Sequence, residues 1–251
     1  AWYQAKELLP VVAVSSGYSS RSHFDGQDFL EAGLGHIDHE SGWLGRAVQA
    51  KNKRALAIAR ATPISLRSDA TVNTWYPSRL QDASTATYES LLKLYEQDEQ
   101  LSILLQDGLD LQQQANSMQS TQRQGRFVDL ARSCASLMVG PQGNDCAMLE
   151  LGGWDTHKGQ ANRLARSLNE LDKGLAVLKE GLGRDWQNTV VIVGTEFGRT
   201  AKENGTGGTD HGTASALFFA GGCYVGSNYM AILWYESNCR SLPRRRRSCR
   251  G

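Results

Sequence analysis

The chain has 251 residues, of which 40% are apolar and 21% are charged. This length and apolar content are enough for one large hydrophobic core, so we expect one α/β domain. The formal net charge is only +1, which excludes the broad basic face of a nucleic-acid-binding domain. The longest apolar runs have the length of strands, so we expect no membrane span.

The first sixty residues predict two strands and two short helices. Residues 8–14 form a valine-rich apolar run that ends in a Ser/Gly segment, which indicates a buried strand followed by a loop. Residues 22–32 have a helical pattern that Gly33 ends, and residues 42–51 predict a second short helix. Residues 54–61 are compatible with a further strand.

The middle and last parts of the chain differ in pattern. From 84 to 138, leucines recur at steps of three and four residues, which predicts helices, and the glutamine-rich stretch 112–124 suits a surface connection. The second half then alternates strand 147–151, helix 160–182, strand 189–193 and strand 214–219. Strands that alternate with long helices are typical of βαβ units and a parallel sheet.

Ionisable residues lie next to each of these last three strands. Asp155 and His157 follow the first, Glu196 and Arg199 follow the second, and Asp210-His211 directly precedes the third. Ligands of parallel sheets collect at the carboxyl ends of strands. Carboxylate and imidazole groups together suit zinc or manganese, whereas an all-oxygen set would indicate calcium or magnesium.

Each of these residues also has an ordinary structural explanation. Asp155 could cap the helix that follows it, and His157 could be a surface histidine. Glu196 could form an ion pair with Arg199, and Asp210 could stabilise a turn. The repetition of the pattern at three strands favours a functional site over these alternatives.

Four ordered motifs resemble an uncharacterised bacterial family, domain of unknown function 1501. They are the segment from Ser20 to Gly33, GGWDTH at 152–157, TEFGR at 195–199 and GTDHG at 208–212. The resemblance covers residues 1–222. We identify this family as sulfatase-like and place it in the alkaline phosphatase superfamily.

The resemblance implies a three-layer α/β/α, alkaline-phosphatase-like fold with a mostly parallel central sheet and a divalent metal site. Asp155, His157 and His211 then resemble metal ligands, while Glu196 stands where relatives have an aspartate followed by a histidine. Phe197 replaces that histidine, so one ligand is missing or comes from elsewhere, and His23 is a candidate.

The resemblance leaves the attacking group open. Ser20 or Ser22 stands at a strand-to-helix turn, where backbone N–H groups could activate a nucleophile, but either serine could equally be a helix N-cap. Arg199 is a third candidate catalytic residue, because its planar fork of donors suits a sulfate or phosphate oxygen.

The ends of the chain depart from the resemblance. A first sheet strand with a metal-binding aspartate is expected ahead of the first residue, so we expect the domain 1–222 to be truncated. Segment 223–251 has no regular period, holds the arginine run 244–247, and is typical of an out-of-frame reading. A basic arm is the alternative. We predict that this tail is irregular, exposed and dispensable.

Two classes of function follow from these patterns. The first is a metal-dependent hydrolase of small-molecule or polymeric sulfate or phosphate esters, periplasmic or secreted, like its relatives. The second is a catalytically inactive sulfatase-like module that binds a carbohydrate, a wall polymer or a protein partner. A phosphoglycerate-mutase-like transferase would share the fold. The oligomeric state does not follow from the sequence.

Overall fold

The computed structural model describes residues 2–77, 83–117, 126–139, 143–222 and 230–234. Its helices are α1 (His23–Ala32), α2 (Trp43–Ala50), α3 (Thr85–Leu94), α4 (Glu99–Ser117), α5 (Phe127–Met138) and α6 (Gln160–Leu182). Its strands are β1 (Leu8–Val14), β2 (Ala55–Ala57), β3 (Val72–Thr74), β4 (Cys146–Met148), β5 (Thr189–Val193), β6 (Gly198–Arg199), β7 (His211–Gly212), β8 (Ser215–Gly221) and β9 (Met230–Trp234).

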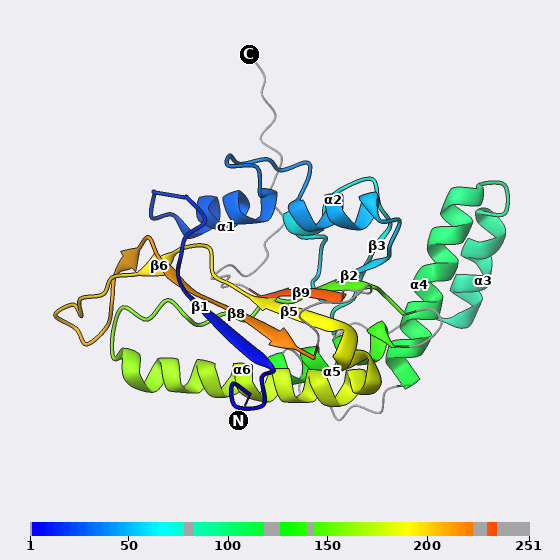
Figure 1. The fold of residues 1–251 in the computed structure, drawn as a ribbon. Coiled ribbons are helices and arrows are strands. Elements are labelled where there is room, and N and C mark those ends of the chain that lie inside the picture. The colour runs from blue at the N-terminus through cyan, green and yellow to red at the C-terminus, as the bar shows by residue number, and fades with distance from the viewer. Residues whose placement is uncertain (1, 78–82, 118–125, 140–142, 223–229, 235–251) are drawn as a thin grey trace, which may run out of the picture.

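The strands form one large mixed sheet in the order β1-β8-β5-β9-β4-β2-β3, and β6 pairs with β7 in a separate ribbon. The pairs from β5 to β3 are all parallel, whereas β8 is antiparallel to both β1 and β5. Helices α1 and α2 cover one face, and α5 and α6 cover the other (Figure 1). The fold is therefore of the α/β class, as expected from the sequence.

The two faces of the sheet carry two separate cores. Leu56 of β2 and Ala147 of β4 belong to the core under α5 and α6, while their neighbours Ala55 and Cys146 belong to the core under α2. This alternation follows from the two-residue period of a strand. Both faces are apolar because helices cover both.

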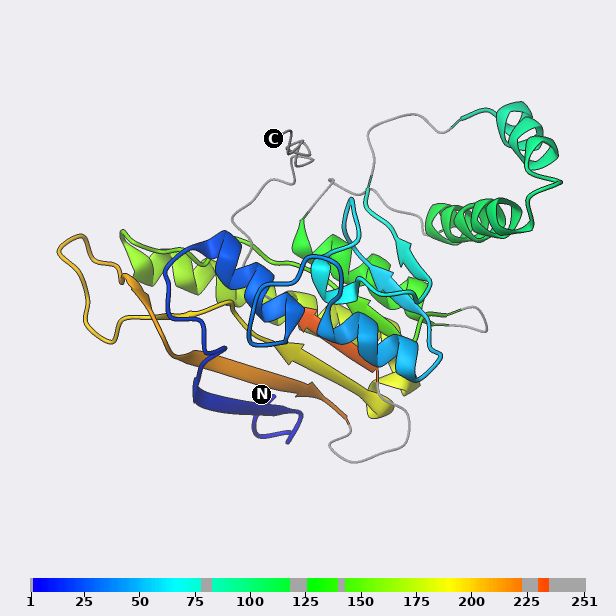
Figure 2. The ribbon, with the colours of Figure 1, turned by 90° about the horizontal axis from the view of Figure 1, so that it is seen from above.

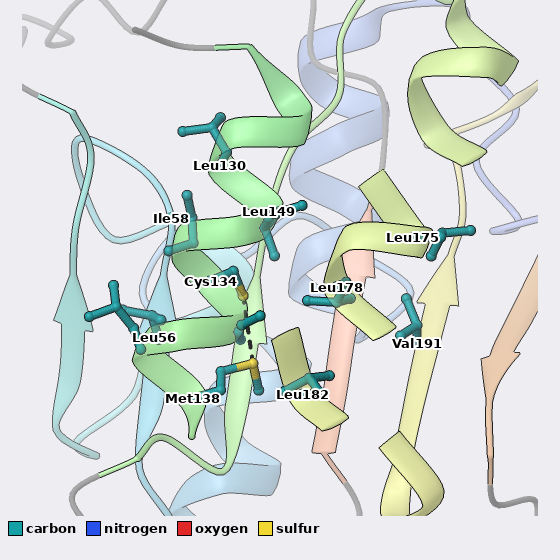
Figure 3. Packing of buried hydrophobic residues seen from close by; sticks show 14 of the residues in the cluster. Leu56, Ile58, Leu130, Cys134, Met138, Leu149, Leu175, Leu178, Leu182 and Val191 are labelled. Atoms are coloured by element: carbon teal, nitrogen blue, oxygen red, sulfur yellow. Dashed lines mark hydrogen bonds between the residues drawn. The ribbon is translucent and has the colours of Figure 1, made fainter. Parts of the chain in front are cut away.

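Helix α6 packs on the sheet through one stripe of residues. Leu171, Leu175, Leu178 and Leu182 are buried at three- and four-residue steps, the spacing of one helix face. Figure 3 shows Leu175, Leu178 and Leu182 in one cluster with Val191 of β5 and with the α5 residues Leu130, Cys134 and Met138. Cys134 and Cys146 are buried free thiols.

Helices α3 and α4 form a hairpin that stands away from the body (Figure 2). It contacts the body at the end of α4, where the Gln114 side chain donates a hydrogen bond to Ser136 O of α5. Leu94 and Ile103 of the hairpin are largely exposed. No helix within the described residues is both long and apolar enough to cross a membrane.

Two expectations about strands are wrong. We predicted a buried strand at 8–14, but β1 is the edge strand and its residues are partly or fully exposed. The sheet is mostly parallel, as expected, although β8 is antiparallel to both of its neighbours. We predicted no strand in the tail, but β9 lies between β5 and β4. The other residues of the tail lie outside the described residues.

Candidate metal centre

The strand directions bring four distant segments to one edge of the sheet. Strands β1, β4 and β5 all run towards this edge, and the antiparallel β8 starts from it. The loop after β1 leads to His23, the loop after β4 carries Asp155 and His157, and the loop after β5 carries Glu196. His211 lies just before β8. Had β8 been parallel to β5, the residues before it would lie at the opposite edge.

The Nδ1 atom of each of three histidines contacts an oxygen. Nδ1 of His23 lies 2.6 Å from Glu196 Oε1, and Nδ1 of His157 lies 3.2 Å from Asp210 Oδ1. Nδ1 of His211 lies 3.0 Å from the backbone oxygen of Arg21. A carbonyl or carboxylate oxygen accepts a hydrogen bond, so Nδ1 carries the proton, and in the neutral ring Nε2 carries the lone pair.

All three Nε2 atoms then face the carboxylate of Asp155. His157 Nε2 and His211 Nε2 lie 2.7 Å and 3.2 Å from Asp155 Oδ1, and 3.1 Å from each other. His23 Nε2 lies 3.3 Å from Asp155 Oδ2, but at an angle that makes no hydrogen bond, so among the described residues this buried nitrogen has no hydrogen-bond partner. Lone pairs that converge on a carboxylate need positive charge between them.

Three of these donor atoms lie close enough together to share one small cation. Two donors that share a tetrahedral zinc ion at about 2.0–2.1 Å lie about 3.3 Å apart. His23, Asp155 and His211 each offer a ligand atom within 4.8 Å of the others, and His157 Nε2 lies beside two of them. Three imidazoles and one carboxylate form a donor set that suits zinc better than calcium or magnesium.

Arg199 holds Asp155 in this arrangement. Its Nη1 donates to Asp155 Oδ1 at 2.5 Å, its Nε donates to Thr209 Oγ1 at 3.1 Å, and its Nη2 donates to the backbone oxygen of Thr209. Burial raises the pKa of Asp155, but the hydrogen bond from Arg199 and the close contact with His211 outweigh it, so this pKa lies below its usual value. Asp155 is therefore ionised at neutral pH.

Glu196 supports His23 from a buried position. Its side chain is 1% exposed, and burial raises its pKa while the hydrogen bond from His23 opposes that rise. The sequence left open an ion pair between Glu196 and Arg199, and it led us to expect that the fork of Arg199 suits an oxyanion. Instead Glu196 contacts His23, and the donors of Arg199 contact Asp155 and Thr209.

Phe197 stands where the resemblance led us to expect a histidine, and His23 lies beside it. The rings of His23 and Phe197 lie 4.9 Å apart between centroids. Phe197 in turn packs on the first turn of α1, where a Cβ on Gly26 would lie 3.0 Å from its ring. The small residue at position 26 thus lets α1 approach closely enough for His23 to reach Asp155.

Sequence reasoning missed Asn204, which organises the loop before His211. Its Nδ2 donates to His157 O and to Asp210 Oδ1, and its Oδ1 accepts from the backbone nitrogen of Gly208. The loop lies so close to His157 that a Cβ on Gly208 would be 2.3 Å from the His157 backbone. Asn204 and Asp210 therefore hold the glycine-rich loop before His211 against His157.

Asp210 lies at the surface and fixes His157. Hydrogen bonds from Asn204 and His157 lower the pKa of Asp210, so at neutral pH it is an ionised carboxylate that accepts a hydrogen bond from Nδ1 of His157. A histidine that binds a metal commonly donates its other ring N–H to a carboxylate. That hydrogen bond orients the imidazole and directs Nε2 at the cation.

The two candidate serines lie in the loop before α1. Ser22 is the N-cap of α1, and its side chain accepts a hydrogen bond from the backbone nitrogen of Asp25. Ser20 is exposed on the same loop. The N-cap explanation thus applies to Ser22, whereas the structure gives Ser20 no such capping role.

Comparison with known proteins gives one match. A family model described as "Protein of unknown function (DUF1501)" matches residues 13–229. This span contains His23, Asp155, His157 and His211, which together form the metal cluster. No curated protein and no solved structure matches the chain.

The match supports the family and nothing beyond it. It carries no link to sulfatases, so our placement of the chain in the alkaline phosphatase superfamily is corrected to a family of unknown function. The matched span covers most of the sequence, and the chain belongs to the DUF1501 family of proteins of unknown function.

Proposed function

We propose that His23, Asp155, His157 and His211 bind one divalent metal ion, and that the protein hydrolyses phosphate or sulfate esters at it. The observation that carries the proposal is the common direction of the three imidazoles. Each Nδ1 lies against an oxygen acceptor, and each Nε2 is directed at Asp155. A proton on Nε2 would pair only one imidazole at a time with Asp155. One cation would accept the lone pairs of all three imidazoles.

Zinc is the metal that this donor set favours, with manganese second. Nitrogen donors dominate the set, and hard cations such as calcium and magnesium prefer oxygen. Once bound, the metal would need a coordination position beyond its protein donors for an ester oxygen, and there it would act as a Lewis acid and offset the charge that builds up on that oxygen. His157 has 41% of its side chain exposed, so an anionic group from solvent could approach the cluster on that side.

The residues around the cluster would act by positioning. Arg199 would hold the Asp155 carboxylate and neutralise part of its charge, while Glu196 and Asp210 would hold the protons on Nδ1 of His23 and His157. Among the candidate nucleophiles, Ser20 remains available because Ser22 caps α1. Location in the periplasm or outside the cell remains a prediction.

A catalytically inactive binding module is the second candidate, and one observation favours it. Nη1, Nη2 and Nε of Arg199 all donate to groups of the protein itself, so this guanidinium does not present its fork to an oxyanion. The hydrolase and the binding module would both bind the metal, and only the hydrolase would turn over an ester.

Metal binding is tested with histidine variants. Wild type purified in zinc should contain about one equivalent of metal, and His211→Ala should lower zinc affinity by about ten-fold or more, because it removes one donor. His36→Ala is the matched control, since His36 is exposed and outside the cluster. Isothermal titration calorimetry and elemental analysis are the measurements.

Two outcomes separate the candidates. Zinc-dependent turnover of aryl phosphate or aryl sulfate that His211→Ala abolishes and His36→Ala preserves would support the hydrolase. Stoichiometric zinc without turnover of either ester would favour the binding module. Equal zinc affinity of wild type and His211→Ala would contradict the metal site itself.

A further inference from the structure

A cavity of about 300 Å³ lies between the first half of α6 and the ends of β5 and β8. Most of its lining is apolar and includes Leu164, Leu168 and Leu171 of α6, Val193 of β5 and Phe218 of β8. Helix α5 packs against the later part of the α6 stripe. The stripe of leucines thus continues past the part that α5 covers and forms one wall of the cavity.

The cavity shares residues with the surroundings of the metal cluster. Phe197 lines the cavity, and its ring lies 4.9 Å from that of His23 and 4.7 Å from that of His211. Arg199 lines it too and bonds to Asp155. Thr156, also in the lining, stands between Asp155 and His157 in the sequence. The cavity therefore borders the metal cluster.

Several of the polar groups in the lining are already paired within the protein. Thr156 Oγ1 donates to Gln160 Oε1, and Thr195 Oγ1 donates to Phe197 O. Arg199 is the one charged residue in the lining, and its donors contact Asp155 and Thr209. Such a lining offers few new hydrogen bonds to a sugar, and it favours an apolar group that removes leucine and phenylalanine surface from water.

We propose that this cavity is the subsite for the organic group of the substrate, and that this group is an aromatic ring or an alkyl group. At about 30 Å³ for each water-sized group, the cavity holds roughly ten non-hydrogen atoms. The inference rests on the proposed function and specifies its substrate as an apolar monoester.

Two phosphonates of the same charge test the subsite. Phenylphosphonate and methylphosphonate are titrated into the zinc-loaded protein by calorimetry. We expect phenylphosphonate to bind at least about ten-fold more tightly, because only its ring fills the cavity.

Two neighbouring substitutions on α6 form the matched pair. Leu168 lines the cavity and is 44% exposed, so Leu168→Trp should fill the cavity, preserve folding, and remove the preference for phenylphosphonate. Asn169→Trp adds the same ring at an exposed position that does not line the cavity, and the preference should persist. Circular dichroism melting checks that both variants fold.

The outcomes test the apolar subsite separately from the proposed metal-dependent hydrolysis. Zinc-dependent binding of both phosphonates with equal affinity would overturn the subsite and leave the metal site in place. A preference for phenylphosphonate that survives Leu168→Trp would also overturn it, because the ring would then bind elsewhere. Absence of zinc-dependent binding for either anion would overturn both proposals.

Discussion

Each histidine of the cluster is oriented by a different kind of acceptor. His23 uses the buried carboxylate of Glu196, His157 the exposed carboxylate of Asp210, and His211 a backbone oxygen. A sequence does not show a backbone acceptor. Glu196 and Asp210 are far along the chain from His23 and His157, the histidines that they orient. The sequence therefore indicated the ligands more readily than the groups that orient them.

The role of Ser22 as N-cap gives a prediction for stability. Ser22→Ala removes the acceptor for the backbone nitrogen of Asp25 and should lower the free energy of unfolding by about 1 kcal/mol. For a domain of this size the melting temperature should fall by about 2–4 °C. Thermal unfolding followed by circular dichroism measures the change.

Ser20→Ala is the matched control for this change. Ser20 is exposed and does not cap α1, so its replacement should leave the melting temperature unchanged. If ester turnover is found, its loss in Ser20→Ala alone would assign the attacking hydroxyl to Ser20. Loss of turnover in Ser22→Ala with unchanged stability would instead contradict the capping role.

At the scale of elements, most helices and strands follow from local pattern. The bounds of α6 and β5 agree with the predicted ranges 160–182 and 189–193 because a leucine stripe and a β-branched run are strong local signals. Strand direction and position in the sheet depend on distant partners instead. For that reason, local pattern did not predict the edge position of β1 or the antiparallel direction of β8.

The position of β9 gives a prediction that reverses our expectation for the tail. Met230–Trp234 pairs with β5 on one side and β4 on the other, so its removal would leave backbone groups of both central strands without partners. A chain that ends at residue 229 should therefore be strongly destabilised, by about 3 kcal/mol or more, because several buried backbone groups lose their partners. Chemical denaturation measures the difference.

A chain that ends after Trp234 is the control for this truncation, because it retains β9. The comparison of the two truncated chains isolates the contribution of the strand. Equal midpoints of denaturation would show that β9 adds nothing to the sheet, as first expected from composition.

At the scale of the whole molecule, the cluster connects parts of the chain that are far apart in sequence. His23 belongs to α1 on one face of the sheet, His211 precedes β8, and Asp155 with His157 lies between β4 and α6. These segments meet at one edge because β1, β4 and β5 share a direction and β8 opposes it. Topology of this kind, rather than motif spacing, creates the site.

A metal that joins these segments should stabilise the native state. Zinc that binds the folded chain and not the unfolded one adds about 2.7 kcal/mol at a free concentration of 100 times its Kd. For a chain of 251 residues this corresponds to a rise in melting temperature of about 5–10 °C. A chelator should reverse the rise, and calorimetric melting with and without zinc measures it.

The contribution of α1 to this effect is tested through His23. His23→Ala removes the one donor that α1 supplies, so zinc should raise the melting temperature of this variant by less than it raises that of wild type. His39→Ala is the control, because His39 pairs with Asp28 outside the cluster and should leave the zinc-dependent rise intact even if it lowers the starting temperature. An undiminished rise in His23→Ala would mean that α1 does not take part in binding, and that the metal joins only the loops around Asp155, His157 and His211.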